Sequence, residues 1–464
     1  MSFFRNLLMN LPEVEGPTEK RLSFKEKLKW TLTILIIFFV LGLIPLFGLG
    51  ENSLQQFEFL SIILAAKFGS LISLGVGPIV TASIILQLLV GSGLVNLDLR
   101  SREGKRTFQG VQKLLAIFFI IFEAGIYVFM GGLAPAVKFA GTVLYTQLQL
   151  ILVFQLFLGG MMILFMDEII SKWGFGSGVS LFIAAGVSEE IFVKAFSWLP
   201  SPTNPEMPVG AVWALFKSLA NNDPLTAGLM LSGILATVLV FVISVYGQAM
   251  KIEIPLSFGK IRGYGIRWPL NFIYTSNIPV ILVAALMANI QLWARLLQNW
   301  GHPWLGSFDA AGNPISGAVL WIFSPNIVGK IIKGSLTSAD ILQALAYVLF
   351  MIVGAVVFSI FWMQTASMDA RSQAKNIMAS GLQIPGFRRD ERILERLLDR
   401  YIMPLTVMGA ILVGFLAAIA DLSGALSRGT GILLAVMIIY KLYEDIAKQH
   451  MYDMHPSLRK FMGG

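Results

Sequence analysis

Ten stretches of the chain are apolar over the length of a membrane span. A helix needs about 20 apolar residues to cross the hydrocarbon core of a bilayer. The longer connections between these stretches cover 199–224, 295–338 and 364–402. The pattern predicts an all-α polytopic membrane protein with ten transmembrane helices. We expect them near 30–49, 77–92, 111–133, 142–166, 177–198, 225–247, 268–294, 339–363, 403–421 and 429–447.

The apolar stretch from Leu54 to Val95 departs from this pattern. It is too long for one span and too short for two spans with a loop. It is also interrupted at 67–70 and again at Gly75-Val76-Gly77-Pro78. We therefore predict a short helix near 56–68 that enters the membrane part-way, followed by a turn and the second span. Broken backbone at membrane depth is tolerated only where protein buries it or where it lines a cavity. The alternative is a kinked helix that faces lipid.

Composition supports the membrane class and argues against an enzyme. Of the 464 residues, 56% are hydrophobic and 13% are charged, whereas a soluble domain has about 25% charged residues. There is no cysteine, and the three histidines are not spaced with other ligands as a metal site requires. Gly174-Phe175-Gly176-Ser177-Gly178 resembles a phosphate-binding loop but lacks its lysine. We expect no catalytic residue, metal or cofactor.

Basic residues predict the orientation. Of the 35 Lys and Arg residues, 27 lie in connections on one side, and that side holds both termini and the 364–402 loop. Cytoplasmic connections carry the excess of Lys and Arg, so both termini are predicted to be cytoplasmic. Five spans per half make the two halves inverted relative to each other, a plan common in transport proteins. We predict halves at 1–205 and 206–464, the second with cytoplasmic loops at about 248–267 and 364–402.

Few ionisable residues lie within the predicted spans. Glu123 is near the middle of the third span. Lys67 ends the half-inserted helix, and the simpler interpretation of this lysine is that its side chain snorkels to the surface. Two classes of protein remain open at this point. One is a passive channel, and the other is a secondary transporter, which should gather ionisable groups around a broken helix at the midplane. The midplane here is mainly Val, Ile and Leu, which favours the channel.

The last long connection combines a helical charge pattern with an exposed aromatic residue. Arg388, Arg392, Arg396 and Arg400 recur every fourth residue, which predicts an amphipathic helix over 390–400. Just before it, Phe387 stands between Pro-Gly and paired arginines. Arginine clusters bind phosphate backbones, so a partner that carries nucleic acid fits this loop. The alternative is a solvated helix with no partner.

Six stretches of the chain together resemble the SecY family, the channel subunits of the Sec translocon, in its archaeal and eukaryotic-like form. Each stretch is weak evidence alone, and the resemblance runs over nearly the whole chain. The stretches are Gly75–Ala82, Leu88–Gly93, Gly176–Gly178, Ser276–Ile281, Ala288–Trp293 and Gly429–Leu434.

The resemblance implies a central protein-conducting channel with ten spans in two inverted halves and a half-inserted plug helix. Such a channel passes unfolded polypeptides across the membrane and releases transmembrane segments sideways into lipid. It is a passive pore driven by a bound partner such as the ribosome, and it is integral to the cytoplasmic membrane of a prokaryote. The implied partners are a SecE/gamma subunit, a beta subunit, the ribosome, the signal-recognition-particle receptor, signal sequences, nascent polypeptides and membrane lipid. An inverted-repeat secondary transporter is the alternative.

The same resemblance implies roles for individual residues. The pore ring, an aliphatic constriction, matches Val76, Val80, Val179, Ile183, Ile278, Ile281 and Leu434. The plug matches a segment that includes Phe57, Phe59, Leu60, Ile63 and Lys67. The lateral gate, which opens toward lipid, matches a polar trio of Thr81, Glu123 and Asn289. Docking of the ribosome and other partners matches Lys260, Arg262, Arg267, Phe387, Arg388 and Arg389.

The predicted orientation can be tested with a protease. Because 364–402 is predicted to be cytoplasmic, a protease added to sealed, right-side-out cells should not cut within it. The same protease should cut there once detergent opens the cells. Cleavage within 364–402 in sealed cells would reverse the assigned orientation.

Overall fold

The computed structural model describes most of the chain. The described residues are 11–18, 22–52, 66–91, 94–95, 101–200, 206–258, 265–275, 278–309, 313–379, 382–383, 390–427 and 429–454.

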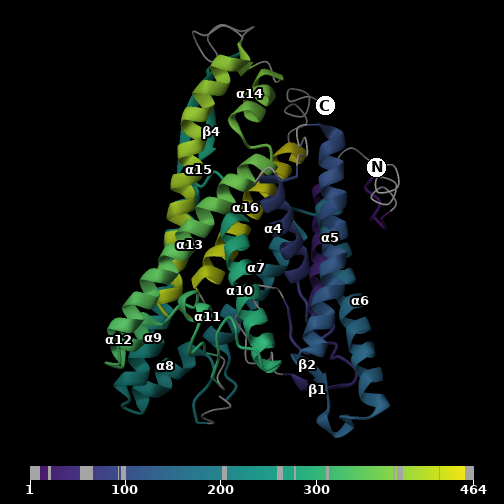
Figure 1. Cartoon of the computed structure of the whole chain (residues 1–464). Coiled ribbons are helices and arrows are strands. Elements are labelled where there is room, and N and C mark those ends of the chain that lie inside the picture. The colour runs from purple at the N-terminus through teal and green to yellow at the C-terminus, as the bar shows by residue number, and fades with distance from the viewer. Residues whose placement is uncertain are drawn as a thin grey trace.

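Ten long helices form the body of the described structure (Figure 1), and each coincides with one of the ten predicted spans. Shorter helices are α8 (Ala211–Ala220), α11 (Ala318–Trp321), α12 (Ile327–Ile332), α14 (Ala370–Ala379) and the 3-10 turn η1 (Val137–Phe139). The long helices are α2 (Phe24–Leu43), α4 (Gly77–Gly91), α5 (Arg102–Phe129), α6 (Val143–Trp173), α7 (Gly178–Phe196), α9 (Pro224–Ala249), α10 (Ile278–Asn299), α13 (Ser338–Thr365), α15 (Glu391–Leu422) and α16 (Gly429–Met454).

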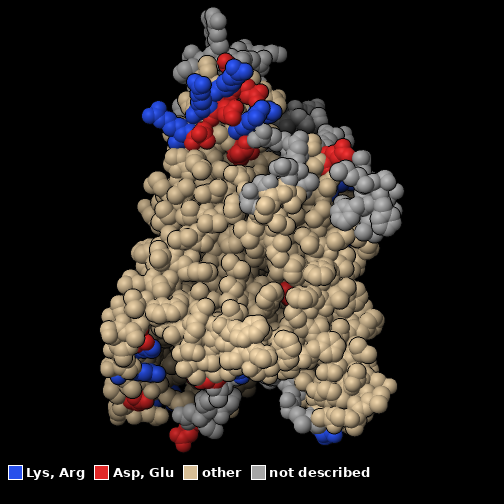
Figure 2. All heavy atoms as spheres, viewed as in Figure 1, with Lys and Arg blue, Asp and Glu red and all other residues tan. Residues whose placement is uncertain are grey.

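The distribution of charge agrees with a membrane protein. Within the described part of the chain, six helices are long and apolar enough by themselves to cross a bilayer. On the face drawn in Figure 2, Lys, Arg, Asp and Glu gather near the two ends of the molecule and leave between them a broad band in which very little charge is visible. Large apolar side chains are exposed along the helices, for example Leu235 and Val238 on α9. A surface of this kind is suited to lipid rather than water.

Several helix boundaries differ from the sequence prediction. Helix α2 begins at Phe24, six residues earlier than expected, because the Ser23 side chain caps it by accepting from the Glu26 amide. Helix α10 begins at Ile278 rather than near 268, because the apolar residues before it form a strand. The predicted amphipathic helix at 390–400 and the ninth span are one continuous helix, α15.

The long helices pack as two groups. The first contains α2, α4, α5, α6 and α7, and the second contains α9, α10, α13, α15 and α16. The groups meet along two seams, one where α4 packs on α10 and α13, and the other where α16 packs on α7 and α2. Buried side chains from both groups form one continuous apolar core between the seams.

The interrupted segment before α4 is buried inside the protein. Ile72, Ser73, Leu74 and Val76 are all fully buried, so the alternative of a kinked lipid-facing helix is wrong here. Its turns need glycine at 75, where φ is +57°. The neighbouring Leu71 carbonyl lies against Gly159 of α6, where an added Cβ would come within 1.8 Å of the oxygen. The predicted plug residues Phe57, Phe59, Leu60 and Ile63 lie outside the described residues.

Two small antiparallel sheets, which the sequence did not predict, lie at opposite ends of the molecule (Figure 1). At one end, β1 (Leu49–Asn52) pairs with β2 (Leu133–Pro135). At the other end, β3 (Lys251–Phe258) pairs with β4 (Gly265–Asn271), and the end of β3 also pairs with β5 (Leu382–Gln383). The end with β3 also holds the start of α2 and the end of α16, which are joined by the hydrogen bond from Lys27 to Gln449.

Residues 13–15, which we call the strap, bind to the first helix group at the end of the molecule that holds β3. Glu13 forms an ion pair with Lys172, the Val14 amide donates to Glu168, and the Trp173 indole donates to the Glu15 carbonyl. The Lys172 ammonium holds the pKa of Glu13 below its ordinary value. Glu168 also pairs with Lys113 of α5, so one carboxylate joins the strap to both α5 and α6.

Candidate functional site

The predicted polar trio comes together at the seam between α4, α5 and α10. The amide Nδ2 of Asn289 donates to the Thr81 hydroxyl at 2.9 Å. That hydroxyl in turn lies 3.3 Å from Glu123 Oε1 and 2.9 Å from the Gly77 carbonyl oxygen. All three side chains are buried, with 8%, 1% and 7% exposure for Thr81, Glu123 and Asn289. Thr81 therefore bridges a residue of the first helix group to a residue of the second.

The trio is incompletely satisfied. Within the described residues, Glu123 Oε2 and Asn289 Oδ1 are buried and accept no hydrogen bond. A buried acceptor without a partner costs about 1–3 kcal/mol. The trio thus joins the two sides by real contacts but leaves polar atoms that would gain from water. Separating the helices at such a seam costs less free energy than breaking a fully hydrogen-bonded network or a dry aliphatic contact.

The predicted pore ring is buried next to this seam. Val76, Val80, Ile183, Ile281 and Leu434 have between 0% and 5% exposure and belong to the same apolar core. Val179 and Ile278 are partly buried and pack against that core. These residues come from the turn before α4 and from α4, α7, α10 and α16. These segments lie far apart in sequence, and all seven of their predicted ring residues are aliphatic.

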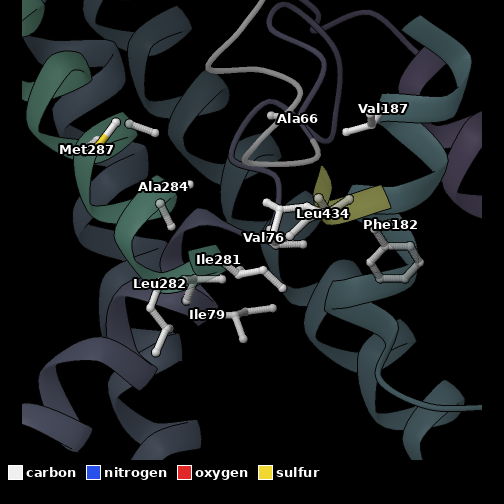
Figure 3. Close-up of a cluster of buried hydrophobic side chains, with 14 of the residues drawn as sticks. Ala66, Val76, Ile79, Phe182, Val187, Ile281, Leu282, Ala284, Met287 and Leu434 are labelled. Atoms are coloured by element: carbon white, nitrogen blue, oxygen red, sulfur yellow. The ribbon is translucent and has the colours of Figure 1, made fainter. Parts of the chain in front are cut away.

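Figure 3 shows how the labelled part of the ring lies. Val76 and Leu434 lie close together, and Ile281 points toward them from the first turn of α10. Ala66 lies beside this group, at the end of the segment that precedes the turns. The ring predicted from these residues would exclude ions, because a narrow aliphatic neck holds water poorly.

Lys67 has partners that the sequence did not indicate. Its ammonium lies 3.0 Å from Glu189 Oε1 of α7 and 5.6 Å from the centre of the Phe39 ring of α2. Its aliphatic stem fills the space beside Gly42, where an added Cβ would come within 2.7 Å of Lys67 Cδ. Both side chains of this ion pair are partly exposed, 34% for Lys67 and 40% for Glu189, so the pairing is compatible with the predicted snorkelling. This contact ties the start of the buried turns to α2 and α7.

The predicted docking residues are described only in part. Lys260, Arg262, Phe387, Arg388 and Arg389 lie outside the described residues, and the backbone of Arg267 lies in β4 opposite Pro255. The pairing of β3 with β5 is informative, however. It joins Ser257 to Gln383 and Phe258 to Leu382, so the two loops emerge from one sheet.

Comparison with known proteins decides the family. Residues 70–443 match the family model described as SecY, and residues 36–69 match the model described as the plug domain of Sec61p. The chain belongs to the SecY family. The SecY protein translocase subunit of Methanothermobacter thermautotrophicus is 44% identical, with 99% of this chain and 98% of that protein covered. The corresponding subunit of Methanocaldococcus jannaschii is 41% identical, with 98% of each covered.

Solved structures agree with the family assignment. A structure of a protein-conducting channel matches with a TM-score of 0.82 at 41% identity, over 97% of this chain and 98% of that one. Sec61 in a canine ribosome–channel complex matches with a TM-score of 0.79 at 41% identity, over the same shares. The chain is therefore an integral membrane protein with the SecY fold of ten helices in two halves. The catalytic class is not favoured, because these relatives are translocation channels.

The sequence of this SecY-family chain did not predict one buried hydrogen-bond network. Asp421, near the end of α15, accepts from the Thr430 amide at 2.7 Å and from the hydroxyls of Tyr347 and Thr430. It thereby caps the start of α16 and ties it to α13 and α15. The signal was present, because an Asp precedes a Ser/Gly turn and a new helix. The span pattern alone predicts only that a helix ends at this position.

Replacing Asn289 with Leu should stabilise the closed seam. The change removes an interhelical hydrogen bond of about 0.6 kcal/mol, but it also removes an unpaired buried acceptor and adds apolar contact of about 1 kcal/mol. If the seam is the lateral gate, the hydrophobicity needed for insertion should rise by about one to two Leu-for-Ala replacements, at about 0.5 kcal/mol each. The measurement is the insertion efficiency of a graded Leu/Ala series of test segments.

Gln291→Leu is the matched control. Gln291 is equally buried on α10, but its amide contacts the Ile322 carbonyl instead of Thr81. Its threshold should shift less than that of Asn289→Leu. A threshold for Asn289→Leu that is unshifted, or that moves toward less hydrophobic segments, would contradict this account of the trio.

Proposed function

We propose that this chain is the central protein-conducting subunit of a Sec-type translocase in the cytoplasmic membrane. Unfolded polypeptides pass between its two helix groups, and transmembrane segments leave sideways into lipid. The observation that carries the proposal is the aliphatic level formed by Val76, Ile281 and Leu434 between those groups. A seal that must admit any sequence cannot depend on hydrogen bonds to a particular substrate, and an aliphatic neck meets that requirement.

In this proposal the seven predicted ring residues form the resting constriction, and the segment that ends at Lys67 is the plug. The match of residues 36–69 to a plug-domain model supports the second assignment. For a related SecY protein, the plug domain stabilises the closed state and maintains a membrane seal. The contacts of Lys67 with Glu189 and Phe39 would fix one end of such a segment.

The polar trio marks the lateral gate in this proposal. The gate runs along the seam where α4 packs on α10 and α13, and the opposite seam, α16 against α7 and α2, acts as its back. The proposed halves, 1–205 and 206–464, then correspond to the two helix groups. Opening needs the hydrogen bond between Thr81 and Asn289 to break, which costs little because each hydrogen bond of this kind contributes less than about 1 kcal/mol in membranes.

A secondary transporter is the weaker interpretation. It needs several ionisable or strongly polar groups that converge on a binding site at the midplane. Within the described residues near the ring, the buried carboxylate of the trio is Glu123, and its neighbours are one hydroxyl and one amide. The ring itself offers no group that could bind a polar solute.

The ribosome is the proposed driving partner, and it would bind the two loops that emerge from the β3–β4–β5 sheet. A structural relative at 41% identity was solved in a ribosome–channel complex. Lys260, Arg262, Arg267, Phe387, Arg388 and Arg389 would supply cations and one aromatic side chain to ribosomal RNA. The SecE/gamma and beta subunits, the signal-recognition-particle receptor and signal sequences complete the proposed set of partners.

Making the ring polar should open the resting channel to ions. Val80→Asn combined with Ile183→Ser should raise ion conductance in planar bilayers, because a polar neck keeps its water. The control pair, Val413→Asn with Ile163→Ser, puts the same polarity into buried positions of α15 and α6. Both variants must assemble with their partners. Equal conductance in the ring variant and the control would mean that Val80 and Ile183 do not line the constriction.

Reversing the charge of the 388–389 pair should weaken ribosome binding. Contacts to RNA phosphates release counterions, so the loss of affinity should be greatest at low salt and shrink as salt rises. The variant is Arg388→Glu with Arg389→Glu, measured by binding of the purified complex to ribosomes across a salt series. Arg396→Glu with Arg400→Glu changes the net charge equally on exposed positions of α15. Unchanged affinity of the first variant would remove this loop from the docking surface.

A further inference from the structure

Helix α8 presents its large apolar residues outward and its small residues inward, whereas a helix on the surface of a soluble protein buries its large apolar residues. Its buried face consists of Ala211, Ala214 and Ser218. Its outward face presents Trp213, Phe216 and Leu219, which are 48%, 62% and 58% exposed. A helix on a protein surface in water places large apolar residues inward and polar residues outward. The solvent that meets the outward face of α8 is therefore not bulk water.

The helix is also too short to cross a membrane. Its 10 residues extend about 15 Å at 1.5 Å per residue, half of a hydrocarbon core of about 30 Å. In Figure 1, α8 lies beside α9 and α12 at the end of the molecule opposite β4 and α14. Lys330 of α12 and Asp340 at the start of α13 form an ion pair near this end. The level of α8 is thus where the apolar band gives way to charge.

Backbone hydrogen bonds hold α8 in place between α7 and α9. The Gly210 amide donates to the Ser197 carbonyl at 2.8 Å, and the Asp223 amide donates to the Ser218 carbonyl at 3.0 Å. An added Cβ at Gly210 would lie 2.5 Å from the Ser197 oxygen, which shows how closely the start of α8 approaches the end of α7. The outward face is therefore presented in one orientation.

We propose that α8 is an interfacial helix whose outward face rests in the lipid leaflet at the end of the molecule opposite the β3–β4–β5 sheet. The occupant of this face is membrane lipid. Continuity with the lipid-facing surface carries the assignment, because exposed Phe192 and Phe196 of α7 lie on one side and exposed Leu225 of α9 on the other. Helices that lie in the interface bury their apolar face about 5–10 Å into the boundary between headgroups and acyl chains.

The polar groups of α8 are compatible with a position at the boundary between headgroups and acyl chains. The Trp213 indole N–H donates to the Phe196 carbonyl at 2.9 Å, so the ring needs no headgroup partner and can lie among acyl chains. Lys217 is the one charged residue of α8, and it is exposed next to Phe216. A lysine at this position extends its ammonium to lipid phosphates while its stem lies on apolar surface. Because α8 joins α7 to α9, lipid would anchor the connection between the two helix groups.

Spin labelling tests the assignment directly, because the chain contains no cysteine. Single cysteines at Trp213, Phe216 and Leu219 are labelled with a nitroxide in the complete complex reconstituted into liposomes. The collision rate of the nitroxide with oxygen, which partitions into lipid, is compared with its collision rate with a water-soluble nickel chelate. Leu235 on α9 provides the lipid reference, and Asn222, exposed in the turn after α8, provides the aqueous reference.

The oxygen-to-nickel ratio at Trp213, Phe216 and Leu219 should lie nearer to that at Leu235 than to that at Asn222. Lys217, on the same helix, should give a lower ratio than Phe216. Three separate label sites protect the test against one variant that fails to assemble. Nickel accessibility at Phe216 equal to that at Asn222 would place α8 in water, and protection from both reagents would place a protein partner on it. Either outcome would overturn the proposal.

Discussion

A polar backbone at membrane depth must find its hydrogen-bond partners inside the protein, and the centre of this molecule depends on that constraint. The turns before α4 satisfy it with their own side chains and with the end of α2. Ser70 donates to the Lys67 carbonyl at 2.6 Å, the Ser73 hydroxyl accepts from the Gly69 amide at 2.9 Å, and the Leu71 amide donates to the Ile44 carbonyl at 2.9 Å. Because the polar backbone groups of these turns have hydrogen-bond partners, the turns can be surrounded by α2, α6 and α7 instead of by water. A non-helical element at the centre of the bundle is what allows Val76 to face the other helix group.

The two seams of the molecule use different chemistry, and the difference suits a channel that opens on one side. At the α4–α10 seam, contact depends partly on a hydroxyl, an amide and a carboxyl, and two of their oxygens accept no hydrogen bond from any residue that the structure describes. At the opposite seam, α16 packs on α7, and the Ser427 hydroxyl just before α16 donates to Glu190 of α7. The first seam loses little when water enters. The second seam is joined by a hydrogen bond to a carboxylate, which is stronger than the neutral hydrogen bond between Asn289 and Thr81, so we expect it to stay closed while the first one opens.

The two ends of the bundle suit partners of different chemistry. One end carries the β3–β4–β5 sheet, from which two basic loops emerge, and the strap of Glu13, Val14 and Glu15 on α6. The other end carries α8, with Trp213, Phe216 and Leu219 outward and one lysine. Charge concentrated on loops suits a large polyanion in water, and a flat aromatic face suits a lipid interface. In the proposed function, the same chain would present one end to a macromolecule and the other end, in part, to the membrane.

The amino-acid sequence by itself determined the membrane class, the ten spans and the break at Gly75–Pro78, because span length, hydropathy and Gly/Pro turns are local properties of the chain. The family motifs added the trio and the ring, and Thr81, Glu123 and Asn289 do meet. Tertiary structure alone decided which polar groups pair across long sequence separations, such as Lys67 with Glu189 and Asp421 with Tyr347. It also decided that the apolar residues of 265–271 form a strand instead of the start of a span, because β3 offers them a partner. Such pairings depend on which helices become neighbours, and that choice is made by packing over the whole bundle rather than by any local pattern.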